Sequence, residues 1–204
     1  MRWIISEKDR QETFLAQVET VSGQKVADCY QCGKCSAGCP VTADARSGPT
    51  NVMRQVQLGQ KEDALANDMV WSCAGCNTCS SRCPEGIDTA CVLDAVRAIA
   101  LHEEVALDMR SEKVRTFYRS FLDSVRDFGR LSEVGLMGGY NINSGRLWTN
   151  VGKAPWFLLK GKIGITAHRV RNITRLERVF QRIRAADHAH IAQAAQAQPE
   201  EKHL

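Results

Sequence analysis

Two stretches of the chain decide its fold: C-Y-Q-C-G-K-C-S-A-G-C-P at residues 29–40 and C-A-G-C-N-T-C-S-S-R-C-P at residues 73–84. Both spell C-x2-C-x2-C-x3-C-P, so one cysteine pattern occurs twice without change. The two runs contain eight of the nine cysteines, and the ninth is Cys91. Because nine is an odd number, a closed set of intrachain disulfides cannot use every thiol.

The spacing within each run favours iron–sulfur clusters. Three cysteines at intervals of three residues let one short loop wrap a corner of a compact cluster, while the fourth cysteine points elsewhere. In proteins that carry two clusters on runs of this kind, the fourth cysteine binds the other cluster. We therefore expect two [4Fe-4S] clusters with crossed ligands. The expected sets are Cys29, Cys32, Cys35 and Cys83 for the first, and Cys73, Cys76, Cys79 and Cys39 for the second.

Structural zinc is the alternative, because four thiolates also suit a tetrahedral zinc ion. Zinc ribbons pair two separated C-x2-C knuckles, whereas each run here packs four cysteines into eleven residues and is duplicated. The pattern thus favours iron over zinc. Cys91 lies inside a helical pattern, and we expect it to be a small buried side chain rather than a ligand.

The composition is that of a globular chain of 204 residues, with 44% hydrophobic and 25% charged residues and a net charge of +4. This length fits one domain, or one small domain with extensions. Residues 2–9 lack the apolar region of an export signal, and the apolar run at 154–159 is too short to span a bilayer. We expect a cytoplasmic protein without a transmembrane segment, where regularly spaced cysteines are metal ligands more often than disulfides.

The hydrophobic pattern predicts a mainly helical chain. Residues 1–28 are expected to form a lead-in of one or two short elements, interpreted as strands. Helices are expected at 49–58, with proline near the start, and at 61–65. Asp88 can cap a further helix that runs to residue 100. A wide apolar stripe at 114–128 predicts a longer helix that Gly129 ends, packed either on the cluster domain's own core or in a partner's groove.

The C-terminal part predicts an extension. Residues 138–152 are rich in glycine and asparagine, which indicates a linker and a domain boundary. Residues 160–184 hold eight Lys or Arg against one Glu and predict a basic amphipathic helix. Docking on an acidic partner is the favoured interpretation, while a solvated face or a membrane or nucleic-acid contact stays open. The tail at 185–204 lacks large apolar residues and is expected to be disordered.

The two four-cysteine runs, the helical insertion between them and the helices that follow resemble the α-helical ferredoxin group. More closely, the chain is similar to the C subunit of heterodisulfide reductase over about residues 25–130. Three stretches carry this resemblance: residues 29–40, P-T-N-V-M-R-Q-V-Q-L-G at 49–59 and W-S-C-A-G-C-N-T-C-S-S-R-C-P at 71–84. The resemblance implies an α-helical ferredoxin-like domain at 29–137 with the eight cysteines of the two runs as ligands. The sequence is similar also to subunits of this kind in bacterial sulfur oxidisers.

The resemblance implies an electron-relay subunit of a hetero-oligomer, without catalysis of its own. Its partners would be a catalytic protein like the B subunit of that enzyme, which handles a disulfide or sulfur compound, and a flavin-containing protein like its A subunit. The residues agree, because no Gly-rich nucleotide loop, H-E-x-x-H or G-x-S-x-G occurs. At 6% aromatic residues, no nucleic-acid stacking surface is expected. Two other functions stay open: an iron–sulfur subunit of a quinone-linked membrane complex and a zinc-bound interaction module.

Overall fold

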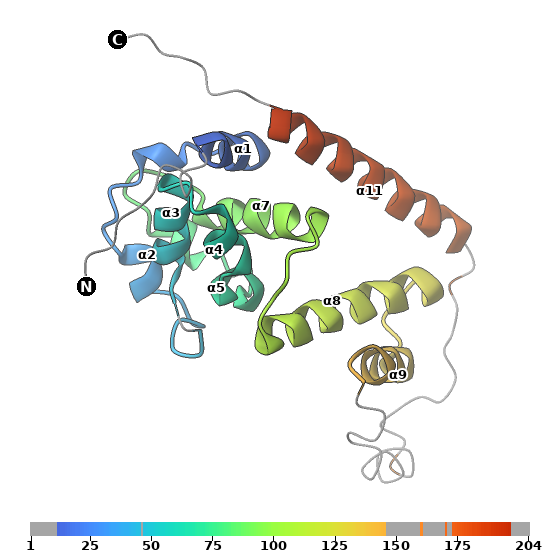
Figure 1. The fold of residues 1–204 in the computed structure, drawn as a ribbon. Helices are drawn as coiled ribbons and strands as arrows, with labels where there is room; N and C mark the ends of the chain where they lie inside the picture. Colours follow the sequence, from blue (N-terminus) through green and yellow to red (C-terminus); the bar gives the residue numbers. More distant parts are fainter. Residues whose placement is uncertain (1–11, 46, 146–159, 161–169, 171–172, 197–204) are drawn as a thin grey trace. The chain divides into compact units, whose positions relative to one another are not determined.

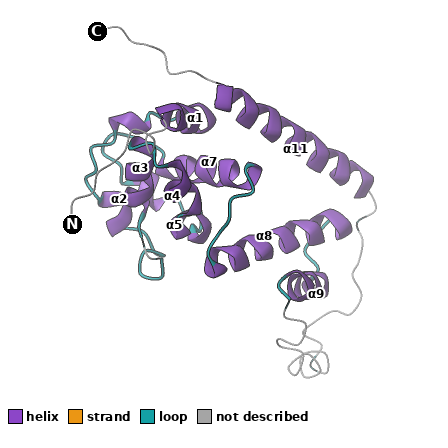
Figure 2. Cartoon of the chain, viewed as in Figure 1, coloured by secondary structure: helices purple, strands orange, loops and turns teal. Residues whose placement is uncertain are grey.

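Apolar residues at intervals of three and four make this chain helical. The computed structural model describes residues 12–45, 47–145, 160, 170 and 173–196. Every regular element in these residues is a helix (Figure 2), which confirms the mainly α prediction. Within the same residues, no helix is long and apolar enough to cross a membrane.

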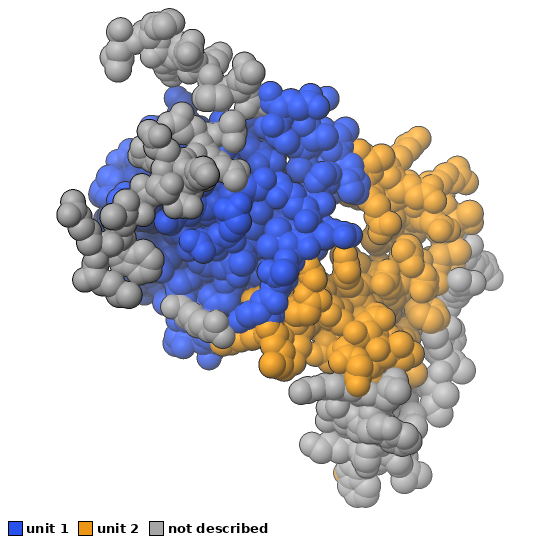
Figure 3. All heavy atoms as spheres, viewed as in Figure 1, with its two compact units in different colours: residues 1–108, 187–204 blue, residues 109–186 orange. Residues whose placement is uncertain are grey.

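The chain divides into two compact units (Figure 3). Unit 1 comprises residues 1–108 and 187–204, and unit 2 comprises residues 109–186. The division between them lies before the linker that we expected at 138–152. The cluster domain expected at 29–137 is therefore divided after Asp108.

Short helices follow one another along unit 1 (Figure 1): α1 (Glu12–Ser22), the 3-10 helix η2 (Val26–Asp28), α2 (Lys34–Ala37), α3 (Pro49–Gln57), α4 (Lys61–Ala66), α5 (Asp68–Ser72), α6 (Thr78–Ser81) and α7 (Thr89–His102). The helix α1 corrects the expectation of strands in the lead-in. Its residues Phe14, Val18 and Val21 recur at intervals of four and three, which places them on one helical face. Phe14 and Val18 are fully buried.

The core of unit 1 lies among α1, α3 and α7. Besides Phe14 and Val18 of α1, this core contains Val52, Met53 and Val56 from α3, and Val92, Leu93, Val96 and Ile99 from α7. Burying a side chain of this size stabilises the fold by about 1.5–3 kcal/mol relative to leaving it exposed. Because α3 and α7 each follow one of the two cysteine runs, this core fixes the helices to which the cysteine loops are attached.

The expected helix starts are present. Pro49 is the first residue of α3, and the carboxylate of Asp88 caps α7 by accepting a hydrogen bond from the Cys91 backbone N–H at 3.1 Å. The helices expected at 49–58, at 61–65 and after Asp88 are thus confirmed. These starts could be predicted because proline and a capping carboxylate act locally.

Unit 2 contains α8 (Met109–Phe128) and α9 (Glu133–Asn143), which pack against each other. As expected, α8 ends at Gly129, whose φ is 77°. The rings of Phe117 and Tyr140 lie 6.0 Å apart across the contact. The loop expected at 138–152 is wrong for residues 138–143, which are helical. Gly139 lies beside the Ser120 side chain of α8, where an added Cβ would make an ordinary contact at 3.9 Å.

The helix α11 (Ile173–Gln196) contains the described part of the basic extension. Of the amphipathic helix expected at 160–184, residues 173–184 are helical, and residues 161–169 lie outside the described part. The helix continues to Gln196, so the disorder expected at 185–204 is wrong for residues 185–196. Alanine and glutamine favour helix, and Ile191 and Ala194 are buried.

Candidate iron–sulfur site

The structure gathers the eight cysteines of the two runs into two pockets in unit 1. The first pocket is lined by Cys29, Cys32, Cys35 and Cys83. The second is lined by Cys39, Cys73, Cys76 and Cys79. Each pocket encloses about 320 Å³ of space, open solvent included. These are the two sets expected from the sequence, including the fourth cysteine that each loop contributes to the other loop's pocket.

Left-handed backbone positions shape both loops in the same way. Gln31 and Gly75 precede the second cysteine of each run with the same φ of 63°. Gly33 and Asn77 follow that cysteine with φ values of 78° and 58°. These bends turn the chain so that three successive cysteines line one pocket. Glycine adopts this conformation without steric cost, while Gln31 and Asn77 are residues that the sequence pattern did not single out.

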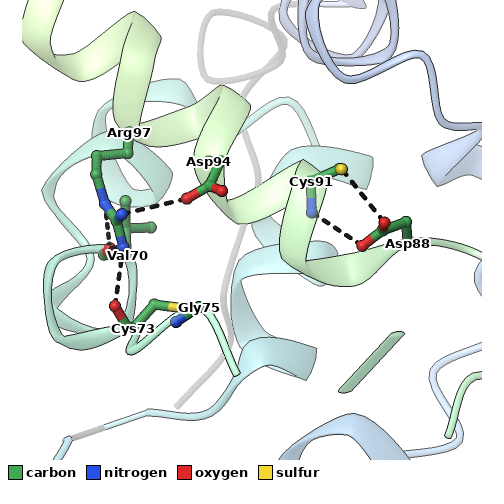
Figure 4. A network of polar contacts seen from close by, with 7 residues as sticks. All are labelled: Val70, Cys73, Gly75, Asp88, Cys91, Asp94 and Arg97. Atoms are coloured by element: carbon green, nitrogen blue, oxygen red, sulfur yellow. Dashed lines mark hydrogen bonds and ion pairs between the residues drawn. The ribbon is translucent and has the colours of Figure 1, made fainter. Parts of the chain in front are cut away.

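The entrance to each loop is fixed by one side chain from the helix that follows. In α3, Gln57 Nε2 donates to the backbone oxygens of Cys29 at 2.7 Å and Val26 at 3.1 Å. In α7, the guanidinium of Arg97 donates to the oxygen of Val70 at 2.6 and 2.9 Å and to that of Cys73 at 3.3 Å (Figure 4). The two arrangements are equivalent, so the internal repeat extends beyond the cysteines into both helices.

Sequence reasoning missed this part of the repeat because the equivalent residues, glutamine and arginine, are chemically different. The signal that could have found them is their position. Gln57 lies 28 residues after Cys29, and Arg97 lies 24 residues after Cys73. If the two halves of the sequence are aligned with a gap between the loop and the helix of the second half, Gln57 and Arg97 fall at the same position.

A serine after the third cysteine of each run joins the loop to a helix N-terminus. Ser36 Oγ accepts a hydrogen bond from the Thr50 backbone N–H at 3.0 Å, and Ser80 Oγ accepts one from the Ala90 backbone N–H at 3.1 Å. Thr50 and Ala90 occupy the second position of α3 and α7. The loops are therefore held at both ends by the helices whose apolar faces form the core.

Three of the thiols that line the pockets have shifted pKa values. Burial raises the pKa of Cys29 and of Cys79. The Thr78 hydroxyl, which lies 3.4 Å from Cys76 Sγ, lowers the pKa of that thiol. Because thiolates rather than thiols bind metal, positive iron ions would offset the cost of charging the buried sulfurs.

Cys91 differs from its expectation, because its side chain is exposed rather than buried. Its thiol donates to Asp88 Oδ2 at 3.3 Å, as Figure 4 shows, and this carboxylate raises the pKa of Cys91. The first turn of α7 leaves this side chain outside the core, while the next two residues, Val92 and Leu93, are fully buried. Cys91 lines neither cysteine pocket.

A zinc ion and an iron–sulfur cluster would require different spacings of the four sulfurs in a pocket. Among the described residues, no three Cys, His, Asp or Glu side chains are placed to hold one metal ion. Tetrahedral zinc would bring its four sulfurs to about 3.8 Å from one another, as Zn–S bonds of about 2.3 Å require. A [4Fe-4S] cluster is wider because each thiolate binds a different iron. Two four-cysteine pockets on a helical scaffold are typical of one class, the helical proteins that bind iron–sulfur clusters.

Comparison with known proteins agrees with this class. Residues 28–88 match the family described as a 4Fe-4S dicluster domain. The chain is 35% identical over 103 residues to the iron-sulfur C subunit of the CoB–CoM heterodisulfide reductase of Methanopyrus kandleri, covering 47% of this chain and 52% of the relative. It is 26% identical over 163 residues to the C subunit of the ferredoxin:CoB-CoM heterodisulfide reductase of Methanosarcina acetivorans, covering 79% of this chain and 63% of the relative. The matches thus span between half and two thirds of these relatives, and they support the resemblance found in the sequence.

Proposed function

We propose that this protein is an electron-transfer subunit of a heterodisulfide-reductase-like complex and relays electrons one at a time through two [4Fe-4S] clusters. The pair of four-cysteine pockets, each completed by a cysteine of the opposite loop, is the observation that carries the proposal. Bound clusters of this type supply reversible one-electron carriers with potentials between about −700 and +450 mV. The chain itself contributes the thiolates, and it positions them through α3 and α7.

The lining of the second pocket supports relay rather than catalysis. Apart from its cysteines, the second pocket is lined mainly by apolar side chains, among them Val41, Pro49, Met69 and Leu93. Such a lining excludes water and offers few polar groups to orient a substrate. Substrate chemistry would then belong to a partner.

The proposed partners are a catalytic protein like the B subunit of heterodisulfide reductase and a flavin-containing protein like its A subunit, in a cytoplasmic hetero-oligomer. The acceptor side would handle a disulfide or another sulfur compound, as in the complexes of sulfur oxidisers. Four exposed arginines of α11 give this helix a positive surface for an acidic partner: Arg175, Arg178, Arg182 and Arg184.

Anaerobic purification of the native protein tests the proposal. We expect about eight iron and eight sulfide per chain, with a broad visible absorption that bleaches on reduction. Mass spectrometry should find a cysteine-rich catalytic subunit and a flavoprotein in the same fraction. Zinc without iron would refute the relay, and a membrane cytochrome in their place would favour the quinone-linked alternative.

A further inference from the structure

The two pockets are built from equivalent parts, but they differ at the helix that follows each loop. The second residue of α3 is Thr50, and the second residue of α7 is Ala90. The residue capping α3 is Gly48, and the residue capping α7 is Asp88. These differences place different hydrogen-bond donors and charges beside the two sets of sulfurs.

In the first pocket, a short chain of hydrogen bonds ends on a cysteine sulfur. Ser36 Oγ donates to Thr50 Oγ1 at 2.8 Å, which leaves the Thr50 hydroxyl hydrogen free for another acceptor. Thr50 Oγ1 lies 3.1 Å from Cys35 Sγ. A ligating cysteine is a thiolate and can only accept, so with a cluster bound the Thr50 hydroxyl donates to the Cys35 sulfur.

In the second pocket, the equivalent serine donates elsewhere. Ser80 Oγ donates to Asp88 Oδ1 at 2.5 Å, and Ala90 has no hydroxyl to reach Cys79. In this pocket the Thr78 hydroxyl lies 3.4 Å from Cys76 Sγ, and the Ser80 side chain also interacts with the Cys79 thiol. In the first pocket, Gln31 Nε2 provides a similar long contact to Cys29 Sγ, at 3.5 Å. The two pockets therefore differ in the donor that faces the third cysteine: the hydrogen of the Thr50 hydroxyl is available to Cys35, whereas Asp88 takes the hydrogen of the Ser80 hydroxyl.

The linings of the two pockets also differ in polarity. Lys34 lines the first pocket. Besides its cysteines and Lys34, this pocket is lined by the polar side chains of Gln31, Thr50 and Thr89, whereas Val41, Met69 and Leu93 line the second. Charges of both signs lie beside the second loop, because Asp88 receives the Ser80 hydrogen bond and Arg97 donates to the Cys73 oxygen. Hydrogen bonds to cluster sulfurs and nearby positive charge favour the reduced state, and an apolar surrounding or nearby negative charge disfavours it.

We infer that Thr50 makes the reduction potential of a cluster in the first pocket higher than that of a cluster in the second. This inference rests on the proposed relay. When a chain receives a single electron, that electron then reduces the cluster held by Cys29, Cys32, Cys35 and Cys83. The other cluster stays oxidised. The first pocket is therefore the side from which an acceptor draws electrons.

The test is a redox titration of the full-length, cluster-loaded protein with dithionite, followed by electron paramagnetic resonance. Thr50→Val keeps the shape of the side chain and removes the hydroxyl. We expect it to move the higher midpoint potential to a more negative value and to leave the lower one unchanged. Thr50→Ser retains a hydroxyl and should keep both potentials.

The reciprocal variant is Ala90→Thr, which places a hydroxyl at the equivalent position beside Cys79. It should move the lower potential to a more positive value. The inference would be overturned if Thr50→Val shifted the lower potential. It would also be overturned if neither Thr50→Val nor Ala90→Thr shifted either potential. Iron and sulfide counts separate this failure from that of the relay, because a protein without clusters would give neither potential.

Discussion

Cys83 and Cys39 are the residues through which each loop reaches the pocket of the other. If the proposed ligand sets hold, Cys83→Ser should alter the cluster of the pocket that contains Cys29, and Cys39→Ser should alter the other one. The expected result is the loss or change of one of two paramagnetic signals, together with a lower iron content per chain.

The matched control for these two variants is Cys91→Ser. Because the Cys91 side chain is exposed and lines neither pocket, this replacement should leave the iron content and both signals unchanged. A loss of iron in Cys91→Ser would show that the proposed ligand sets are incomplete.

The Asp88 carboxylate should make the stability of the fold depend on pH. Its pKa lies below the ordinary value because the Ser80 hydroxyl and the Cys91 N–H donate to the charged carboxylate. A carboxyl group with a lowered folded-state pKa stabilises the fold above its unfolded pKa of about 3.9, and this contribution is lost as the pH falls through the folded pKa. The wild type should thus exceed Asp88→Ala in unfolding free energy by about 1 kcal/mol at pH 7.

Chemical unfolding at a series of pH values measures this difference. It should stay constant from pH 8 to about pH 5 and shrink below about pH 4. Asp88→Asn separates the two effects, because asparagine also caps a helix but carries no charge. A difference that grows as the pH falls would contradict the assignment of the lowered pKa.

At this scale, the sequence predicts the sets of cysteines but not the residues that hold them. The spacing groups the first three thiols of each run, and the crossing of the fourth follows from proteins that carry two clusters on runs of this kind. Gln57 and Arg97 could not be predicted as equivalent, since either residue type can reach a backbone oxygen and neither resembles the other. The burial expected for Cys91 is wrong because one helical position separates a core-facing residue from an exposed one.

At the scale of elements, α3 and α7 carry the structure of both loops. Removing the side chain in Arg97→Ala leaves the oxygens of Val70 and Cys73 without their donor. We expect a loss of about 1–3 kcal/mol in unfolding free energy. The conservative variant Arg97→Gln copies the residue of α3 and should retain much of the stability.

Urea denaturation, followed by circular dichroism, gives both values. If Arg97→Ala and Arg97→Gln lose equal stability, a single side-chain amide cannot replace the guanidinium in this half. If neither loses stability, the hydrogen bonds to the loop entrance do not stabilise the fold.

The helices that could be predicted are those with local start signals and a regular apolar face, such as α3, α7 and α8. The helices that were missed have different causes. In α9, Gly138 and Gly139 indicate a loop by composition but lie in a helix that packs against α8. In α11, the residues after Ala185 look disordered by composition, but burial of Ile191 depends on the folded core, which no local pattern shows.

At the scale of the whole molecule, the clusters should stabilise unit 1. Thiolates of the two loops would meet on a shared metal group, so cluster binding contributes directly to folding free energy. Removing iron anaerobically with a chelator should lower the thermal midpoint. The loss of helical signal should begin at a lower temperature than in the loaded protein. Equal midpoints for the two forms would show that the helical core alone fixes the loops.

The crossing of Cys39 and Cys83 also bears on symmetry. A polypeptide with a single repeat would offer three thiolates to its own pocket and one to that of a second copy. Two such copies would form a homodimer with two identical sites, and an electron would have no preferred site between them. Joining the copies in one chain, as after a gene duplication and fusion, allows each to vary alone. Thr50 and Ala90 can then differ, and the pair of sites can acquire a direction.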